Sequence, residues 1–194
     1  MNKPLQMPMF SPQTEWVPPL NLPDLKEYSE IAIDLETRDP NLMTMGSGSV
    51  RGDGEVVGIA IAVEGWSGYF PIAHEAGGNM DRALVLDWFE EVLHTDATKI
   101  FHNAMYDVSW IRALGFQIRG GIIDTMIAAS LVNENRWSFT LDSISKEFIG
   151  MGKNEKILAE AAKAWGVNPK AEMWRLPAPL VGEYAERDAE VTLK

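Results

Sequence analysis

The order of predicted elements along these 194 residues indicates an α/β fold, a five-stranded mixed sheet flanked by helices. Three strands come first, and a hairpin turn joins the second and third, which predicts antiparallel neighbours. Each of the two later strands follows a helix, so it enters the sheet through a helical crossover. These observations favour a sheet that combines antiparallel and parallel pairs.

Five apolar runs define the strands. The first run ends in acidic residues and is typical of a core strand that leaves the sheet for a loop. The dipeptide Glu64-Gly65 separates two β-branched runs, which predicts the hairpin, and Pro71 indicates an edge strand. The predicted strands are 31–36, 56–63, 67–72, 99–101 and 117–123.

Apolar residues at helical spacing predict a helix over 81–93, and a second from about 103 to 114, where Gly115 ends it. Residues 37–54 contain Pro40 and four glycines, which predicts a loop without helices. Most of the remaining chain is expected to be helical, over 124–132, 140–149, 154–165 and 181–194.

Prolines divide the chain into an N-terminal arm and one domain. Residues 1–23 contain six prolines, which predicts an extended arm, and residues 24–194 are long enough to bury a core of their own. The chain contains no long apolar stretch and no secretory signal, so we expect a cytoplasmic protein that does not enter a membrane.

Composition limits the kind of site. There are no cysteines, and the three histidines have no metal-binding spacing, so a metal would need oxygen ligands. The formal net charge of −11 argues against nucleic-acid binding through a broadly basic surface. The acidic residues either form an ordinary solvated surface or cluster to hold divalent cations.

Three short patterns place acidic residues at structured positions. Asp34 and Glu36 are two apart on a predicted strand and therefore share a face. This pair fits a hard cation such as Mg²⁺, but acids at a strand end are also common where a strand runs into a solvated loop.

The second and third patterns lie on predicted helices. Asp107 falls about one turn into a helix, where it could also simply complement the helix dipole. Tyr184 and Asp188 are one turn apart on one face of the last helix, which could alternatively be an amphipathic surface helix. Each pattern alone leaves both interpretations open, but their order along the chain is compatible with one metal cluster.

As an ordered set, Asp34-Leu35-Glu36-Thr37, Asn103 to Asp107 and Tyr184 to Asp188 resemble the three motifs of the DEDD exonucleases, in the Tyr-containing subgroup. The resemblance is to the 3′→5′ proofreading domain of bacterial and phage family-A (polymerase I type) DNA polymerases. It covers roughly residues 28–194 and includes Asp124-Thr125-Met126 as a supporting match.

The resemblance implies a ribonuclease H-like fold and a two-metal 3′→5′ exonuclease that uses Mg²⁺ or Mn²⁺. It implies that Asp34, Glu36 and Asp188 bind one ion, that Asp34 and Asp107 serve a second, and that Tyr184 positions the attacking water. Thr37 and Asn103 are the implied contacts to the terminal nucleotide.

The expected substrate is DNA with a single-stranded or frayed 3′ end, and the expected products are nucleoside 5′-monophosphates. A polymerase domain is expected downstream in the same chain, because the last predicted helix still continues at the final residue. The expected setting is the cytoplasm of a bacterial or phage-infected cell. Two other functions remain open: a ribonuclease D-like RNA-trimming nuclease, and a catalytically silent nucleic-acid-binding module.

Aromatic and basic residues outside the motifs suggest further contacts. Helical spacing places Trp88, Trp110 and Trp165 in the core. Trp137, beside Arg136, is a candidate contact to a DNA strand, and Lys153 and Lys156 are candidate phosphate contacts.

Overall fold

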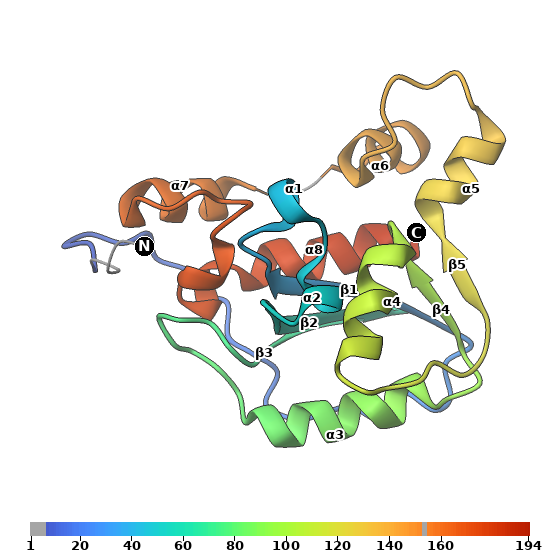
Figure 1. The fold of residues 1–194 in the computed structure, drawn as a ribbon, viewed down its shortest axis with the longest axis horizontal. Coiled ribbons are helices and arrows are strands. Elements are labelled where there is room, and N and C mark those ends of the chain that lie inside the picture. The colour runs from blue at the N-terminus through green and yellow to red at the C-terminus, as the bar shows by residue number, and fades with distance from the viewer. Residues whose placement is uncertain (1–6, 153–154) are drawn as a thin grey trace.

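The computed structural model describes residues 7–152 and 155–194, whose centre is a five-stranded sheet in the order β3-β2-β1-β4-β5 (Figure 1). The β1–β2 and β2–β3 pairs are antiparallel, whereas β1–β4 and β4–β5 are parallel. The predicted mixed sheet is confirmed, and β3, which ends at Pro71, lies at its edge. The strands are β1 (Glu30–Arg38), β2 (Glu55–Val63), β3 (Trp66–Pro71), β4 (Thr98–Phe101) and β5 (Ile122–Asp124).

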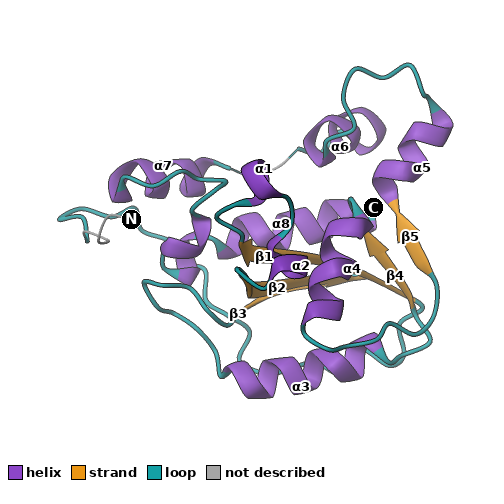
Figure 2. Cartoon of the chain, in the orientation of Figure 1, coloured by secondary structure: helices purple, strands orange, loops and turns teal. Residues whose placement is uncertain are grey.

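Helices pack on both faces of this sheet (Figure 2). The predicted helices are present, with ends that differ by a few residues from the expected ones. The longer helices are α3 (Arg82–Leu93), α4 (Ala104–Ala113), α5 (Thr125–Val132), α6 (Leu141–Ile149), α7 (Lys156–Trp165) and α8 (Gly182–Leu193). Two short 3₁₀ turns, η1 (Met173–Arg175) and η2 (Ala178–Leu180), lead into α8.

The side chains of β1 alternate between two apolar cores. One core contains Ile31, Ile33 and Leu35 with residues of α3 and α4, whereas Ala32 packs in a second core with residues of α7 and α8. Because successive side chains of a strand point to opposite faces, the even-numbered residues of β1 face α8. The central strand therefore directs Asp34 toward the helix that carries Tyr184.

The predicted loop over 37–54 was wrong in one respect, because it contains two four-residue helices, α1 (Leu42–Met45) and α2 (Gly48–Arg51). The Ser47 hydroxyl accepts a hydrogen bond from the Ser49 N–H, and the Asp39 carboxylate accepts one from the Gly48 N–H. These local bonds hold a single turn that is too short to show apolar periodicity in the sequence.

The last strand is shorter than predicted over 117–123, since it begins only at Ile122. Gly120 has a φ of 77°, a left-handed conformation that interrupts an extended strand. A Cβ at this position would lie 2.3 Å from the carbonyl oxygen of Ala97, the residue before β4. The close approach of these two backbone segments therefore also requires glycine.

The described part of the N-terminal arm, residues 7–23, contains neither helix nor strand and runs along the domain surface. Trp16 anchors it: a Cβ on Gly182 would lie 2.1 Å from the indole ring, and the indole N–H donates to the Glu186 carboxylate at 2.9 Å. The Trp88 indole donates to the Pro23 carbonyl at 2.8 Å. The arm is therefore held to α3 and α8 by two tryptophan hydrogen bonds.

The predicted core positions of Trp110 and Trp165 are confirmed, and Trp88 is partly buried against the same core as Trp110. Among the described residues, no helix combines the length and apolar character that a membrane crossing requires.

Candidate active site

The structure gathers the predicted acidic residues where β1, α4 and α8 approach one another. Asp34 and Glu36 extend from the α8 side of the central strand, both partly buried. Their register partners on β2 are the small residues Ala60 and Gly58, and the Tyr69 side chain occupies the space over Gly58.

Asp107 lies in the first turn of α4 and its side chain is 4% exposed. Its Oδ1 accepts a hydrogen bond from the Leu35 backbone N–H at 3.1 Å, between the two acidic residues of β1. Burial, followed by the negative charge of Asp34, raises the pKa of the Asp107 carboxyl well above its ordinary value. Asp107 is thus more than a complement to the helix dipole, because it contacts the central strand directly.

Tyr184 and Asp188 lie one turn apart on α8, and Asp188 is 3% exposed, so this side of α8 is not a surface face. The Tyr184 hydroxyl is hydrogen-bonded to Asp188. Burial and the charges of Glu36, Asp188 and Asp34 raise the pKa of Tyr184 far above its usual range. The phenol therefore stays protonated at any physiological pH and acts as a hydrogen-bond donor.

The charges that act on these groups are of one sign. Asp34 raises the pKa of Asp107 and, with Glu36, those of Tyr184 and the buried Tyr69. Oxygen ligands with surplus negative charge are the donor set that Mg²⁺ and Mn²⁺ prefer, so the chemistry of these residues fits a hard divalent cation. Within the described ranges, no group of three or more His, Asp or Glu side chains stands in an arrangement that could hold a metal ion.

Thr37 and Asn103, the predicted nucleotide contacts, lie on different elements: Thr37 follows Glu36 on β1, and Asn103 directly precedes α4. The Thr37 hydroxyl and the Tyr106 hydroxyl lie 2.7 Å apart in a hydrogen bond that links the end of β1 to α4. Asn103 is exposed, precedes α4 and has a φ of 69°, a left-handed conformation that asparagine tolerates better than most residues.

Tyr69 forms a buried wall beside Glu36 and was not singled out from the sequence. A Cβ on Gly58, the register partner of Glu36, would lie 2.0 Å from the Tyr69 hydroxyl. That hydroxyl is 2.6 Å from His74 Nε2, and His74 Nδ1 is 3.0 Å from the Leu176 carbonyl. Since a carbonyl can only accept, neutral His74 donates through Nδ1 and accepts from Tyr69.

Burial lowers the pKa of His74 to about 4, which keeps the imidazole neutral. The Tyr69–His74–Leu176 chain of hydrogen bonds thereby connects β3 to the segment that leads into α8. No short spacing in the sequence signals this connection, because Leu176 is 102 residues from His74.

His102 and Asp124 are two further residues at the site to which sequence reasoning gave no role. His102 Nδ1 is 2.8 Å from the Thr125 hydroxyl, and its Nε2 is 3.0 Å from the Phe139 carbonyl. Asp124 accepts backbone N–H groups from the beginnings of α4 and α5. An acid between a strand and a helix is a capping signal that could have identified the contact to α5.

Arg136, the neighbour of the predicted DNA contact Trp137, uses its guanidinium within the domain. It forms an ion pair with Glu147 at 2.5 Å and lies over the Phe148 ring, 5.4 Å from the centroid. Trp137 is fully exposed, and Lys156 is exposed at the start of α7. Lys153 lies outside the described residues.

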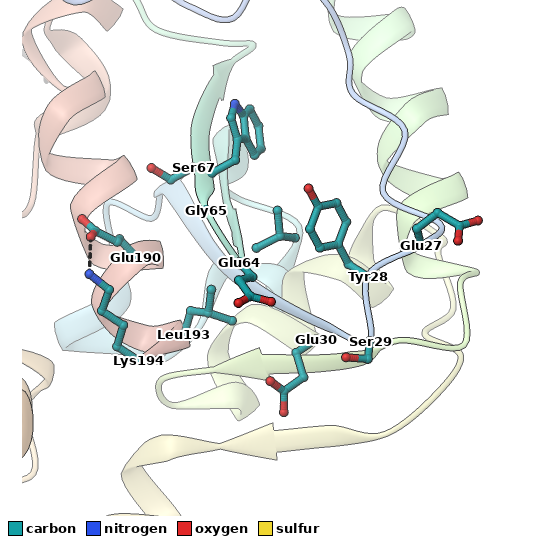
Figure 3. A pocket seen from close by; sticks show the side chains of 12 residues that line it. Glu27, Tyr28, Ser29, Glu30, Glu64, Gly65, Ser67, Glu190, Leu193 and Lys194 are labelled. Atoms are coloured by element: carbon teal, nitrogen blue, oxygen red, sulfur yellow. Dashed lines mark hydrogen bonds and ion pairs between the residues drawn. The ribbon is translucent and has the colours of Figure 1, made fainter.

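A cavity of about 800 Å³ lies at the opposite end of β1, where the strand begins (Figure 3). Glu27, Glu30 and Glu64 line it, with Lys194 and Glu190 of α8 forming an ion pair at its edge. Of the described residues that line the cavity, none is a predicted site residue, so its size alone does not make it the chemical centre.

The five-stranded mixed sheet with helices on both faces has the ribonuclease H-like architecture that the resemblance of the motifs implied. Residues 22–194 match the sequence family described as 3′-5′ exonuclease. The chain therefore belongs to the 3′-5′ exonuclease domain family of family-A DNA polymerases, as the resemblance of its motifs predicted.

Similar proteins include two phage polymerases. A DNA-directed DNA polymerase of Pseudomonas phage M6 is 35% identical over 202 residues, covering 97% of this chain and 30% of the relative. DNA polymerase DpoZ of Salmonella phage PMBT28 is 30% identical over 179 residues, covering 89% and 26%. The chain thus spans less than a third of the length of either polymerase.

Among solved structures, Brucella melitensis NrnC bound to pGG matches with a TM-score of 0.57 and 24% identity, covering 90% of this chain and 72% of that chain. A structure described as the apo form of the nuclease also has a TM-score of 0.57, at 20% identity and covering 84% and 68%. These matches establish the shared fold.

Proposed function

We propose that this domain removes nucleotides from the 3′ end of DNA by two-metal hydrolysis and proofreads for a DNA polymerase. The observation that supports this proposal is electrostatic proximity: the charges of Glu36, Asp188 and Asp34 act on the Tyr184 hydroxyl, and the charge of Asp34 acts on Asp107. The chain's membership in a 3′-5′ exonuclease family, together with the DNA polymerases among its relatives, supports DNA as the substrate.

The ligands would divide between two ions of Mg²⁺ or Mn²⁺. Asp34, Glu36 and Asp188 would hold one ion, and Asp34 together with Asp107 would hold the other. When bound, these ions neutralise the scissile phosphate, lower the pKa of the attacking water and stabilise the leaving 3′-oxygen. They also explain how a chain with a formal net charge of −11 binds an anionic substrate, because the positive charge is local.

The remaining side chains orient the reactants. The Tyr184 hydroxyl, kept protonated by burial and by Glu36, donates a hydrogen bond rather than accepting a proton. It is therefore suited to orienting the water molecule and unsuited to acting as a general base. Thr37 at the end of β1 and Asn103 before α4 would contact the terminal nucleotide. The products would be nucleoside 5′-monophosphates.

The required substrate end is single-stranded or frayed. Asp107 and Asp188 are almost fully buried, so a terminal phosphate must separate from its paired strand to approach them. This requirement would select mismatched termini for removal. A polymerase domain of the same chain is the expected partner, since the polymerase relatives are more than three times as long as this chain's match to them.

A ribonuclease D-like RNA-trimming activity is the second candidate, because the same acidic residues would serve RNA equally well. The names of the polymerase relatives favour DNA. A silent binding module is less favoured, since all four acidic positions retain their carboxylates.

The test uses a primer labelled at its 5′ end and mismatched at its 3′ end, beside an RNA primer of the same sequence, with Mg²⁺. We expect a ladder that shortens from the 3′ end, disappears with a chelator, and forms faster on DNA and on the mismatch. Asp34→Ala should lower the rate by about a hundredfold or more, equivalent to roughly 3 kcal/mol.

Asp87→Ala is the matched control, because it removes an exposed aspartate from α3, away from the acidic residues. Its rate should equal that of the wild type. Absence of shortening with both Mg²⁺ and Mn²⁺, from protein that circular dichroism shows to be folded, would reject the nuclease proposal for this domain. Faster shortening of the RNA primer would select the ribonuclease D-like alternative.

A further inference from the structure

Asp124 connects two strand–helix junctions through one carboxylate. It is the last residue of β5 and pairs in register with Phe101, the last residue of β4. Its Oδ1 accepts the Asn103 N–H at 3.0 Å and the Met126 N–H at 2.9 Å, with a longer contact of 3.4 Å to the Ile127 N–H. Its Oδ2 accepts the Ala104 N–H at 2.8 Å.

These bonds give α4 a cap that its own N-terminal residue does not supply. Within the described part of the chain, the Asn103 side chain makes no capping bond to α4. The first N–H groups of a helix have no partner inside the helix, so a carboxylate from elsewhere both satisfies them and complements the helix dipole. Asp124 therefore caps the N-terminus of α4 from the neighbouring strand β5, whereas a helix is normally capped by the residue that precedes it.

The same bonds hold an unfavourable backbone conformation. Asn103 has a φ of 69°, and a non-glycine residue in the left-handed region needs surrounding contacts to stay there. Since Asp124 binds both the Asn103 and the Ala104 N–H, it determines how the chain turns from β4 into α4.

Asp107 lies on the first turn that this arrangement begins. Ala104, which Asp124 binds, is the first residue of α4, and Asp107 is only three residues later. The contact of Asp107 Oδ1 with the Leu35 N–H therefore depends on where α4 starts. Small displacements of a reacting group are costly, because an error of about 1 Å can reduce a rate by about a hundredfold.

We propose that Asp124 is a positioning residue for the nuclease site: by capping α4 and α5 together, it fixes the Asp107 carboxylate against β1. This inference rests on the proposed function, in which Asp107 holds a metal ion. Asp124 binds the backbone of Asn103 and Ala104, and its charge is also one of the smaller causes that raise the pKa of Asp107.

The test compares Asp124→Ala with Asp81→Ala in the 194-residue chain. Asp81 caps α3 through the Leu84 N–H at 3.0 Å, so its replacement also removes a carboxylate cap, but from a helix that carries no acidic site residue. Asp124→Asn keeps one acceptor oxygen of the same size and serves as the conservative variant.

Three quantities are measured for each protein: kcat and KM on the labelled DNA primer, the Kd for Mn²⁺ alone by titration calorimetry, and amide hydrogen exchange over residues 103–107. Asp124→Ala should lower kcat, weaken Mn²⁺ binding, or do both, by about 10–100-fold, as replacement of residues that orient metal ligands commonly does. KM should change less than twofold, and exchange at 103–107 should accelerate. Asp124→Asn should give values between those of Asp124→Ala and the wild type. Asp81→Ala should keep the wild-type kinetic constants, Mn²⁺ affinity and exchange rate over residues 103–107.

Equal kcat, Mn²⁺ affinity and exchange in Asp124→Ala and Asp81→Ala would overturn the inference. If Asp124→Ala does not fold, Asp124→Asn decides in its place by the same comparison. A wild-type protein without nuclease activity would reject the proposed function only, since Mn²⁺ affinity and amide exchange would still report whether Asp124 positions Asp107.

Discussion

Gly58 is the position at which one added methyl group should have the largest effect on the wall of the site. In Gly58→Ala the new Cβ would lie 2.0 Å from the Tyr69 hydroxyl, 2.3 Å from Cζ and 2.4 Å from Cε2. All three atoms belong to a fully buried ring whose hydroxyl is bonded to His74, so the ring cannot move without loss of that bond.

The expected loss of stability has two parts. Overpacking of a close-packed interior costs about 1–3 kcal/mol. Separation of Tyr69 from His74 adds about 1 kcal/mol for a lost buried hydrogen bond. The sum is about 2–4 kcal/mol, which for a domain of this length corresponds to a decrease in Tm of roughly 4–16 °C.

Differential scanning calorimetry measures this decrease, with Gly121→Ala as the matched control. The three atoms nearest to a Cβ on Gly121 all belong to the Thr98 side chain and lie at 3.3 Å or more, so the Tm of this variant should stay within about 2 °C of the wild type. Because Gly58 pairs with Glu36, the same variant should also lose nuclease activity at temperatures where it remains folded. Equal Tm values for the two alanine variants would refute the argument that Tyr69 excludes a side chain at Gly58.

Three further predictions concern buried polar groups and the N-terminal arm. Burial lowers the pKa of His74 from 6.5 to about 4, so between these pH values the unfolded chain binds a proton that the folded chain does not. The free energy of unfolding should therefore decrease by about 3 kcal/mol as pH falls from 6.5 to 4. Chemical denaturation across this range should show a smaller dependence of the unfolding free energy on pH for His74→Asn. Lys99 is fully buried, and its Nζ donates to the Ala97 and Arg119 carbonyls, each at 3.0 Å. In urea titrations, Lys99→Met should therefore reduce the free energy of unfolding by about 2–4 kcal/mol, whereas Lys163→Met, at an exposed position, should leave it unchanged. Equal urea midpoints for the two variants would contradict this prediction. Trp16→Ala should make the N-terminal arm accessible to limited proteolysis and lower the free energy of unfolding by about 2 kcal/mol. Val17→Ala, at a position that is 69% exposed, should leave the rate of cleavage unchanged.

Local periodicity was sufficient for most of the elements. Alternation on β1 placed Asp34 and Glu36 on one face, and helical spacing placed Tyr184 beside Asp188, because both relations depend only on the geometry of a single element. Short elements escaped this reasoning, as α1 and α2 did, since four residues contain too little pattern. The late start of the last strand, after Gly120, depended on the close passage of another segment, which no local pattern records.

The sequence by itself determined the type of sheet, the family motifs and the chemical character of the site, because oxygen ligands without cysteine or paired histidine favour hard cations. Only the tertiary structure decided how these residues are held. It showed that Asp107 contacts the backbone of β1, that Arg136 is used within the domain, that Tyr69 and His74 join β3 to Leu176, and that Asp124 caps α4 from β5. The physical reason is that the contacts of Asp107 with Leu35, of His74 with Leu176 and of Asp124 with Ala104 join residues 72, 102 and 20 positions apart. Their distances are set by packing of the whole fold and not by the spacing of neighbouring residues.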